Sequence, residues 1–317
     1  MVRTDTKQRI VWIDWTKSIC IFLMVVGHWT SNDNVLLFIY SFHMPALFIV
    51  SGLLYKPRPW HKSMLSFAVP VAFFSFVNIA YLLLTGSICI ENLFSKDVFF
   101  RLFHYRYGLG DGFYCGDWFL WALFGLRLFY GDVSYLSPLR KYYIPIAVSV
   151  IIYMSLESHF LTIDTIFRGA YIGRLVPAMP FFCLGFFLKD NSWEPWKFSV
   201  FTMFALSCLL FIMPIINGNS SINSNVYGIS YVVFFIFASI SSVIIFELSS
   251  CLPELKFVTI ISNGTLLILG LHIPIMKALD MVCPSCLHEF LPMAVLPICY
   301  FPIIYLYKWC PILLGKV

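Results

Sequence analysis

Long apolar stretches recur along the chain, and short polar segments separate them. We interpret ten of these stretches as membrane-spanning helices, although the fourth and fifth are shorter than the roughly 20 residues that a bilayer core requires. Nearly continuous apolar runs favour helices over a membrane barrel, whose strands would show short segments of alternating polarity. The predicted spans are residues 10–30, 35–55, 64–85, 117–131, 142–158, 170–188, 198–216, 226–248, 258–277 and 290–308.

The composition agrees with a chain embedded in lipid. Hydrophobic residues make up 60% of the 317 residues and charged residues only 12%, whereas soluble domains have about 45–50% and about 25%. This low charge excludes the nucleic-acid-binding, disordered and small disulfide-stapled classes. Because the sequence shows no soluble appendage, linker or internal repeat, we expect residues 1–317 to form one all-α, polytopic membrane domain.

The positions of lysine and arginine predict the orientation. If the N-terminus is inside and each span crosses once, thirteen of these residues lie in inner segments, five in outer segments and three within spans. The positive-inside rule therefore favours ten spans with both termini cytoplasmic. We expect the chain in the inner or plasma membrane of the cell. The inner residues are Arg3, Lys7, Arg9, Lys56, Arg58, Lys62, Arg140, Lys141, Lys189, Lys197, Lys256, Lys308 and Lys316, and the outer residues are Lys96, Arg101, Arg106, Arg168 and Lys277.

Three predicted outer loops differ in character. The longest, at about 86–116, is aromatic and basic, and it fits either an interfacial helix or a lid over a site. Residues 217–225 have the composition of a plain polar loop. Cys283 and Cys286 fit free thiols or a local disulfide better than a zinc site, because no second pair of ligands accompanies them.

Ionisable residues within a span are costly and usually functional, and the first span has three: Asp14, Lys17 and His28. Lys17 and His28 are eleven residues apart, which places them on one helix face about 16 Å apart along the axis. Asp14 lies one turn before Lys17 and can pair with it. This face therefore offers a cation near the cytoplasm and an imidazole deeper in the membrane, with Ile21 and Met24 between them.

Two later spans add further histidines. Pro45 removes the helical donor of the Ser41 carbonyl, so we expect a kink that turns His43 toward a cavity. Gly52 permits close helix packing, and His272 lies in the ninth span. One such histidine is as often a packing residue as a functional one, but three histidines with a co-facial lysine favour a shared buried polar site.

Arg127, Arg174 and Glu247 are further charged residues within the predicted spans. For Arg127 and Glu247 we favour a structural role. Arg174 follows Gly173 near the outer end of the sixth span, where lining a cavity is the better interpretation.

The order of these residues resembles a known family. Lys17-x10-His28 resembles the first-helix signature of membrane-bound acyltransferase family 3, in its fucose O-acetylase-like, or polysaccharide O-acetyltransferase, branch. Residues 42–52 and the Trp118-Phe119-Leu120 element resemble later motifs of that branch. The segment from Asn263 to His272 resembles its late helix motif but lacks the tyrosine that the motif usually contains.

The resemblance implies transfer of an acyl group, usually acetyl, from cytoplasmic acyl-CoA to a hydroxyl of a cell-surface polysaccharide or its lipid-linked precursor. It gives His28 the role of general base, with Asp14 and His43 as further catalytic candidates. Lys17 would bind the CoA phosphates, with Trp118 and His272 as weaker candidates on the donor side, and no metal is implied. The candidates for binding the glycan are Arg174, Tyr105 and Tyr107.

Two other functions remain open from the sequence. A proton-coupled transporter or flippase would also use histidines within the membrane, but transporters commonly show paired halves, which this sequence lacks. A sensor or scaffold could keep the family's shape without its chemistry, and the intact Lys17 and His28 argue against it. The sequence leaves the acyl group, the acceptor and the oligomeric state open, a homo-oligomer included.

Overall fold

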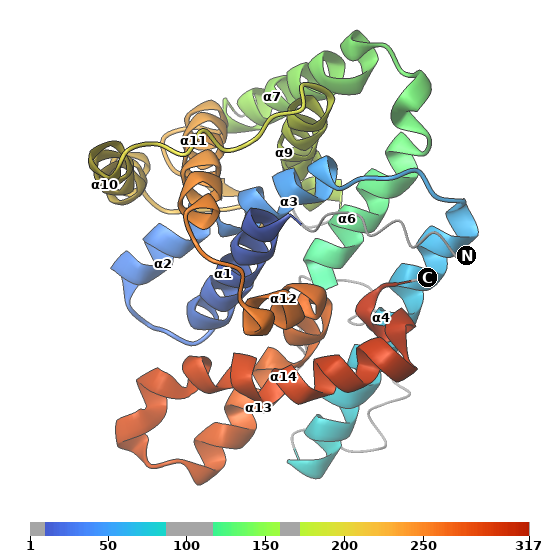
Figure 1. The fold of residues 1–317 in the computed structure, drawn as a ribbon, viewed down its shortest axis with the longest axis vertical. Helices are drawn as coiled ribbons and strands as arrows, with labels where there is room; N and C mark the ends of the chain where they lie inside the picture. Colours follow the sequence, from blue (N-terminus) through green and yellow to red (C-terminus); the bar gives the residue numbers. More distant parts are fainter. Residues whose placement is uncertain (1–9, 87–116, 159–171, 317) are drawn as a thin grey trace.

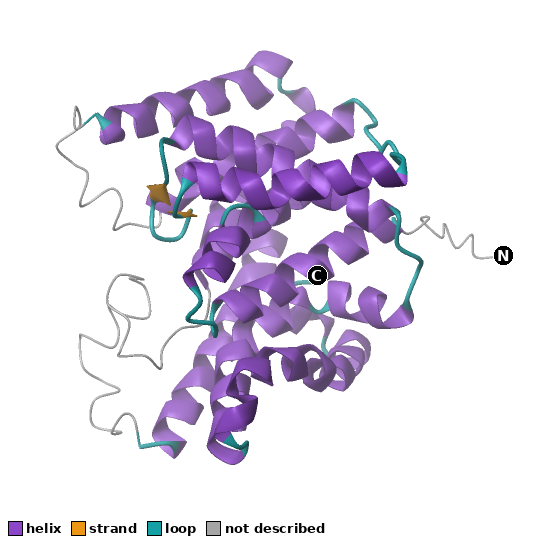
Figure 2. Cartoon of the chain, turned by 90° about the vertical axis from the view of Figure 1, so that its left-hand side faces the viewer, coloured by secondary structure: helices purple, strands orange, loops and turns teal. Residues whose placement is uncertain are grey.

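The structure is a computed structural model, and it describes residues 10–86, 117–158 and 172–316 (Figure 1). Most of the predicted outer loop 86–116, with Tyr105 and Tyr107, lies outside the described residues. Helices dominate the described part of the chain (Figure 2), and seven helical segments there are long and apolar enough to cross a membrane. The predicted all-α, multi-pass membrane fold is confirmed at this level, and the count of ten spans and the orientation stay predictions.

Every predicted span contains helix. The longer helices are α1 (Val11–Gly27), α2 (Asp33–Tyr40), α3 (His43–Leu53), α4 (Trp60–Leu84), α6 (Asp117–Tyr130), α7 (Ile144–Glu157), α9 (Ile172–Asp190), α10 (Val200–Asn217), α11 (Tyr231–Ser250), α12 (Lys256–Asn263), α13 (Thr265–Val282) and α14 (Leu291–Trp309). The short elements are η4 (Val133–Tyr135), η5 (Leu139–Tyr143), β1 (Ser220–Ser221), β2 (Val226–Tyr227), η6 (Ser285–Phe290) and η7 (Pro311–Leu314).

The second predicted span is broken between α2 and α3. Pro45 lies in the first turn of α3, where the missing amide hydrogen is tolerated. The Ile39 carbonyl at the end of α2 accepts a hydrogen bond from His43 Nδ1 at 2.7 Å, and the Phe38 carbonyl accepts one from the Ser41 hydroxyl at 2.7 Å. The predicted kink is therefore a full break whose carbonyls are satisfied by side chains.

The ninth predicted span is also interrupted. The sequence predicted one continuous helix here, and that prediction is wrong. Helix α12 ends at Asn263 and α13 begins at Thr265, with Gly264 between them. A Cβ on Gly264 would lie 2.2 Å from the Ile303 side chain of α14. The glycine thus lets α14 press against the chain at the point where the helix changes course.

Helix α1 lies at the centre of the bundle. It packs against α3, α11, α12, α13 and α14, and Figure 1 shows it between the group α7, α9 and α11 and the group α13 and α14. Its side chains enter two separate apolar cores, because Ile13 and Cys20 belong to the core around α3 and α9, while Ile21 and Met24 belong to the core around α13 and α14. The polar residues of α1 therefore lie along the boundary between two cores.

Helices α3 and α9 approach each other to backbone contact. A Cβ on Gly52 would lie 2.1 Å from the carbonyl oxygen of Phe182, and a Cβ on Gly185 would lie 2.1 Å from the carbonyl oxygen of Ile49. Small residues at such a crossing replace side-chain packing by direct backbone packing, which is common in membrane helices. The predicted role of Gly52 in close helix packing is confirmed.

The segment 217–225 is not a plain polar loop. It contains strand β1 and the turn of a small hairpin of β1 and β2, and Asn225 is only 1% exposed. The Asn225 side-chain oxygen accepts hydrogen bonds from the hydroxyls of Tyr153 and Tyr227, at 3.0 Å and 2.9 Å. Composition alone could not show that these polar groups bond to buried tyrosines of α7 and β2 rather than to water.

We expect Gly185→Ala to lower stability by about 1–3 kcal/mol, because the added methyl group overpacks a site with no room for it. The measurement is the thermal unfolding midpoint of the full chain in detergent. Phe204→Leu on α10, where the side chain is 69% exposed, is the control and should leave the midpoint unchanged. Equal midpoints for Gly185→Ala and wild type would contradict the close crossing of α3 and α9.

Candidate functional site

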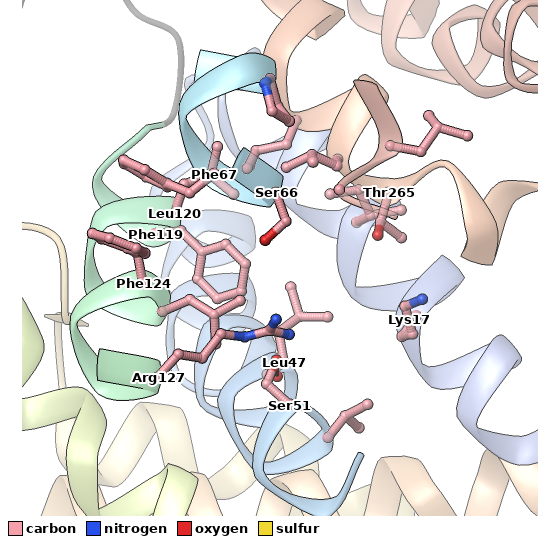
Figure 3. A pocket seen from close by; sticks show the side chains of 18 of the residues that line it. Lys17, Leu47, Ser51, Ser66, Phe67, Phe119, Leu120, Phe124, Arg127 and Thr265 are labelled. Carbon is pink, nitrogen blue, oxygen red and sulfur yellow. Dashed lines mark hydrogen bonds between the residues drawn. The ribbon is translucent and has the colours of Figure 1, made fainter. Parts of the chain in front are cut away.

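A cavity of about 240 Å³ lies beside α1, between α3, α4, α6 and α13. We call it the central cavity. Its α1 wall consists of Lys17, Ile21 and Met24, which is the stripe that the sequence predicts below His28. Figure 3 shows Lys17 on one side and Arg127 reaching in from α6 on the other. Apart from these two cations and a few hydroxyl groups, the lining is apolar.

His28 and His272 meet just beyond the Met24 end of the central cavity. His28 caps the C-terminus of α1, one turn after Met24, and its ring lies 5.1 Å from the His272 ring, centroid to centroid, at an interplanar angle of 43°. His272 is completely buried. Its neighbour one turn back, Leu269, also lines the cavity, so the ring pair lies next to the cavity wall.

The hydrogen bonds of His272 define its tautomer. Nδ1 lies 2.8 Å from the Leu269 carbonyl oxygen and 3.1 Å from that of Ile268. Because a carbonyl oxygen only accepts, Nδ1 carries the proton and, in the neutral ring, Nε2 has a lone pair. Nε2 is buried and has no hydrogen-bond partner among the residues that the structure describes. A buried acceptor without a partner is unfavourable, which makes Nε2 a candidate for contact with a substrate.

His43 belongs to the same region. It is 3% exposed, and its Nδ1 donates to the Ile39 carbonyl. The neighbouring Tyr40 donates its hydroxyl to the Gly27 carbonyl at 2.7 Å, which ties the end of α2 to the end of α1. His28 interacts electrostatically with both His43 and His272. The structure thus brings together the three histidines that the sequence singles out, and their chemical roles stay predictions.

Asp14 and Lys17 fasten α1 to the end of α12. The Lys17 ammonium donates to the Ser262 carbonyl, and the Ser262 hydroxyl donates to Asp14 Oδ1 at 2.6 Å. The break at Gly264 leaves carbonyls of α12 without helical donors, and Lys17 supplies one. Asp14 is 8% exposed and lies in the first turn of α1, where the helix dipole favours a negative charge. Lys17 therefore has a structural contact as well as a place on the cavity wall.

Other predicted site residues lie in the packed interior. Trp118 is 5% exposed and contacts Phe48, with ring centroids 6.3 Å apart, while its neighbours Phe119 and Leu120 line the central cavity instead. Arg174 is 5% exposed, and its Nε donates to the Asn223 carbonyl at 3.2 Å. These surroundings favour a packing role for Trp118. They favour for Arg174 a structural role in holding the hairpin, and the binding roles of both residues stay predictions.

Glu247 and Arg127, both interpreted as structural from the sequence, differ in the structure. The Glu247 carboxylate accepts the backbone amides of Trp196 and Lys197, at 2.9 Å and 3.2 Å, which agrees with a structural role. Arg127 lines the central cavity instead, together with Ser51, Ser66 and Thr265. The sequence did not identify Ser51, Ser66 and Thr265 as cavity residues, because serine and threonine are common in apolar helices. Of this group only Arg127 stood out, as a charge within an apolar helix.

Several basic residues of the predicted inner segments lie at one end of the bundle. Lys189 donates to the Tyr55 carbonyl, and Lys141 forms an ion pair with Asp190. These contacts bring separate segments together at a common end. We call this the basic end, and it is marked by Lys56, Arg58, Lys141 and Lys189.

Comparison with protein families decides the identity. A family model described as an acyltransferase domain matches residues 10–307, nearly the whole chain. The chain belongs to acyltransferase family 3. The curated proteins and the solved structures give no match to this acyltransferase.

Family membership makes the central cavity and the histidines beside it the candidate active site of the acyltransferase. Among the described residues, no group of three or more His, Cys, Asp and Glu side chains is arranged to hold a metal ion. Cys283 and Cys286 are both free thiols. The polar side chains that line or adjoin this site in the described part of the chain are the imidazoles, several hydroxyls, the cations Lys17 and Arg127, and the Asp14 carboxylate beyond Ser262.

Gly270 and Phe74 hold α13 and α4 together near His272. A Cβ on Gly270 would lie 2.3 Å from Phe74 Cγ. We expect Gly270→Ala and Phe74→Leu each to lower the thermal midpoint, and the double variant to lose less than the two losses combined, because leucine gives the methyl group room. The expected coupling is about 0.5–3 kcal/mol in a double-mutant cycle. Strictly additive losses would show that the two residues are not in contact.

Proposed function

We propose that this acyltransferase moves an acyl group, usually acetyl in the family that it resembles, from cytoplasmic acyl-CoA to a hydroxyl of a cell-surface polysaccharide or its lipid-linked precursor. The observation that carries the proposal is the central cavity, which runs along α1 from Lys17 to Met24 and ends beside the His28–His272 pair. The distance along α1 from Lys17 to His28, about 16 Å, is comparable to the length of an extended pantetheine arm. The apolar lining of the cavity suits a chain that carries little charge.

The proposed reaction places the thioester next to His28. The neutral His28 imidazole takes the proton of the acceptor hydroxyl as the oxygen attacks the thioester carbonyl carbon. The carbon–sulfur bond then breaks, and the proton taken by His28 returns to the leaving CoA sulfur. Acyl ester and CoA thiol are the products, so no further reactant is needed.

The remaining site residues support His28 in this proposal. The His272 ring lies against His28, and its Nε2 lone pair is available to orient the imidazole or the acceptor hydroxyl. His43 is the first residue of α3, directly after the break that follows α2. From there it can bind the acceptor. Asp14 acts at a distance, by holding Ser262 and thereby the position of Lys17.

We expect His28→Ala to reduce acyl transfer by about a hundredfold or more, the usual contribution of a general base, with the thermal midpoint retained. The measurement is mass spectrometry of the host's surface glycan, with the gene deleted and then restored as wild type or variant. His61→Ala, at an exposed position outside the site, is the control and should restore modification.

Two results would contradict this function. Full modification of the glycan by His28→Ala would remove His28 as the base. Movement of a saccharide into vesicles that contain the purified protein, without consumption of acyl-CoA, would favour the transporter or flippase instead.

We expect Lys17→Ala to weaken acyl-CoA binding more than Lys17→Arg does, because an arginine retains the positive charge that attracts phosphate. Equilibrium binding of labelled acetyl-CoA to the purified chain measures the difference. Lys256→Ala, at the exposed start of α12, tests for a general effect of removing one charge. Equal affinities for wild type and both Lys17 variants would leave Lys17 with only its structural contact to Ser262.

A further inference from the structure

A second cavity, of about 370 Å³, continues from the central cavity toward the basic end. It lies between residues 57–60, which lead into α4, and residues 127–132, where α6 ends. We call it the rim cavity. Ser63 and Arg127 line both cavities, so the two meet at these side chains. Together they extend from the loop that carries Arg58 to the wall beside the histidines.

Arg127 is a partly buried cation for which the described residues supply no anionic partner. Its Nε is buried and has no hydrogen-bond partner among the described residues, and no carboxylate of the described chain lies within ion-pair distance of it. The charge that acts on it most directly is a like charge, that of Arg58. Burial of an unpaired charge is unfavourable, and this applies to Arg127, which is partly buried, whereas Arg58 is exposed beside it. A counter-charge that reaches Arg127 would therefore be favourable, and the second cation would attract it further.

Asp132 does not supply that counter-charge to Arg127. Its Oδ1 accepts hydrogen bonds from the hydroxyl and the backbone amide of Ser134. These bonds hold the pKa of the Asp132 carboxyl below its ordinary value, so the group is ionised at neutral pH. With Asp132 counted as negative and Arg58 and Arg127 as positive, the rim cavity still keeps one net positive charge.

The chemistry of this cavity fits a phosphate ligand. A guanidinium presents several donors in a plane, which matches the oxygens of a phosphate group. Ser63 adds a hydroxyl at the junction of the cavities. CoA carries a diphosphate and a ribose phosphate, which is more negative charge than Lys17 alone can balance.

We propose that Arg127 and Arg58 bind phosphate groups of the acyl donor in the rim cavity, so that its thiol-bearing arm runs through the central cavity to His28. The identification of the donor as acyl-CoA rests on the proposed function, whereas the phosphate site rests on the two arginines and the cavity. Arg127 is thereby a donor-binding residue and not a structural one.

The test measures binding to the full chain in lipid nanodiscs with two probes: CoA, and S-acetylpantetheine, which has no phosphate. We expect Arg127→Met to weaken CoA binding about tenfold or more, as for a lost hydrogen bond between charged groups, and Arg127→Lys to weaken it less. Binding of S-acetylpantetheine should not change. Arg140→Gln, an exposed basic residue that lines neither cavity, should bind CoA as the wild type does.

Two outcomes would overturn the assignment of Arg127. The first is equal weakening of both probes, which would indicate a structural defect. The second is an unchanged affinity for CoA. A wild-type protein that binds neither probe would contradict the proposed donor instead. In that case inorganic pyrophosphate decides the phosphate site: a rise in the thermal midpoint of wild type but not of Arg127→Met supports it, and no rise in wild type rejects it.

Discussion

A backbone carbonyl surrounded by lipid or apolar side chains must find a donor within the protein, and this constraint determines where the polar side chains of the bundle lie. Helix α2 ends before α3 begins, and the side chain of His43 satisfies the carbonyl that the break exposes. Helix α12 ends before α13 begins, and Lys17 does the same there. His272 donates to two carbonyls of its own helix. The side chains that donate to these backbone carbonyls thus lie around the candidate site.

This arrangement links stability to chemistry through the tautomers of the rings. A histidine that donates from Nδ1 to a carbonyl is held in one orientation and, when neutral, presents the lone pair of Nε2 on its far side. In His272 that lone pair has no partner among the described residues, and the ring faces His28. The fold therefore presents an oriented lone pair beside the wall of an apolar cavity.

Sequence patterns predicted the helices well, because spans of apolar residues and the spacing from Lys17 to His28 depend only on local geometry. The same patterns predicted a kink near Pro45, since proline acts on its own helix, but not the full break between α2 and α3. They missed the break at Gly264, which depends on the approach of Ile303 from α14. They also could not predict the burial of Asn217 and Asn225 or the cavity position of Arg127, because both depend on which distant segments pack nearby. The role of Tyr105 and Tyr107 in binding the glycan stays a prediction, because both lie outside the described residues.

Glu247 and Arg127 show why a charge within an apolar helix cannot be interpreted from sequence alone. The two residues look alike there, each a single charge among hydrophobic neighbours. In the structure Glu247 accepts two backbone amides, so its charge is satisfied by the fold and needs no ligand. Arg127 has a buried donor for which the described part of the chain supplies no acceptor, beside a second cation and at the junction of two cavities. The charge of Glu247 is thus satisfied within the scaffold, whereas the charge of Arg127 is not satisfied by the described residues, and this difference is the basis for proposing a phosphate ligand at Arg127.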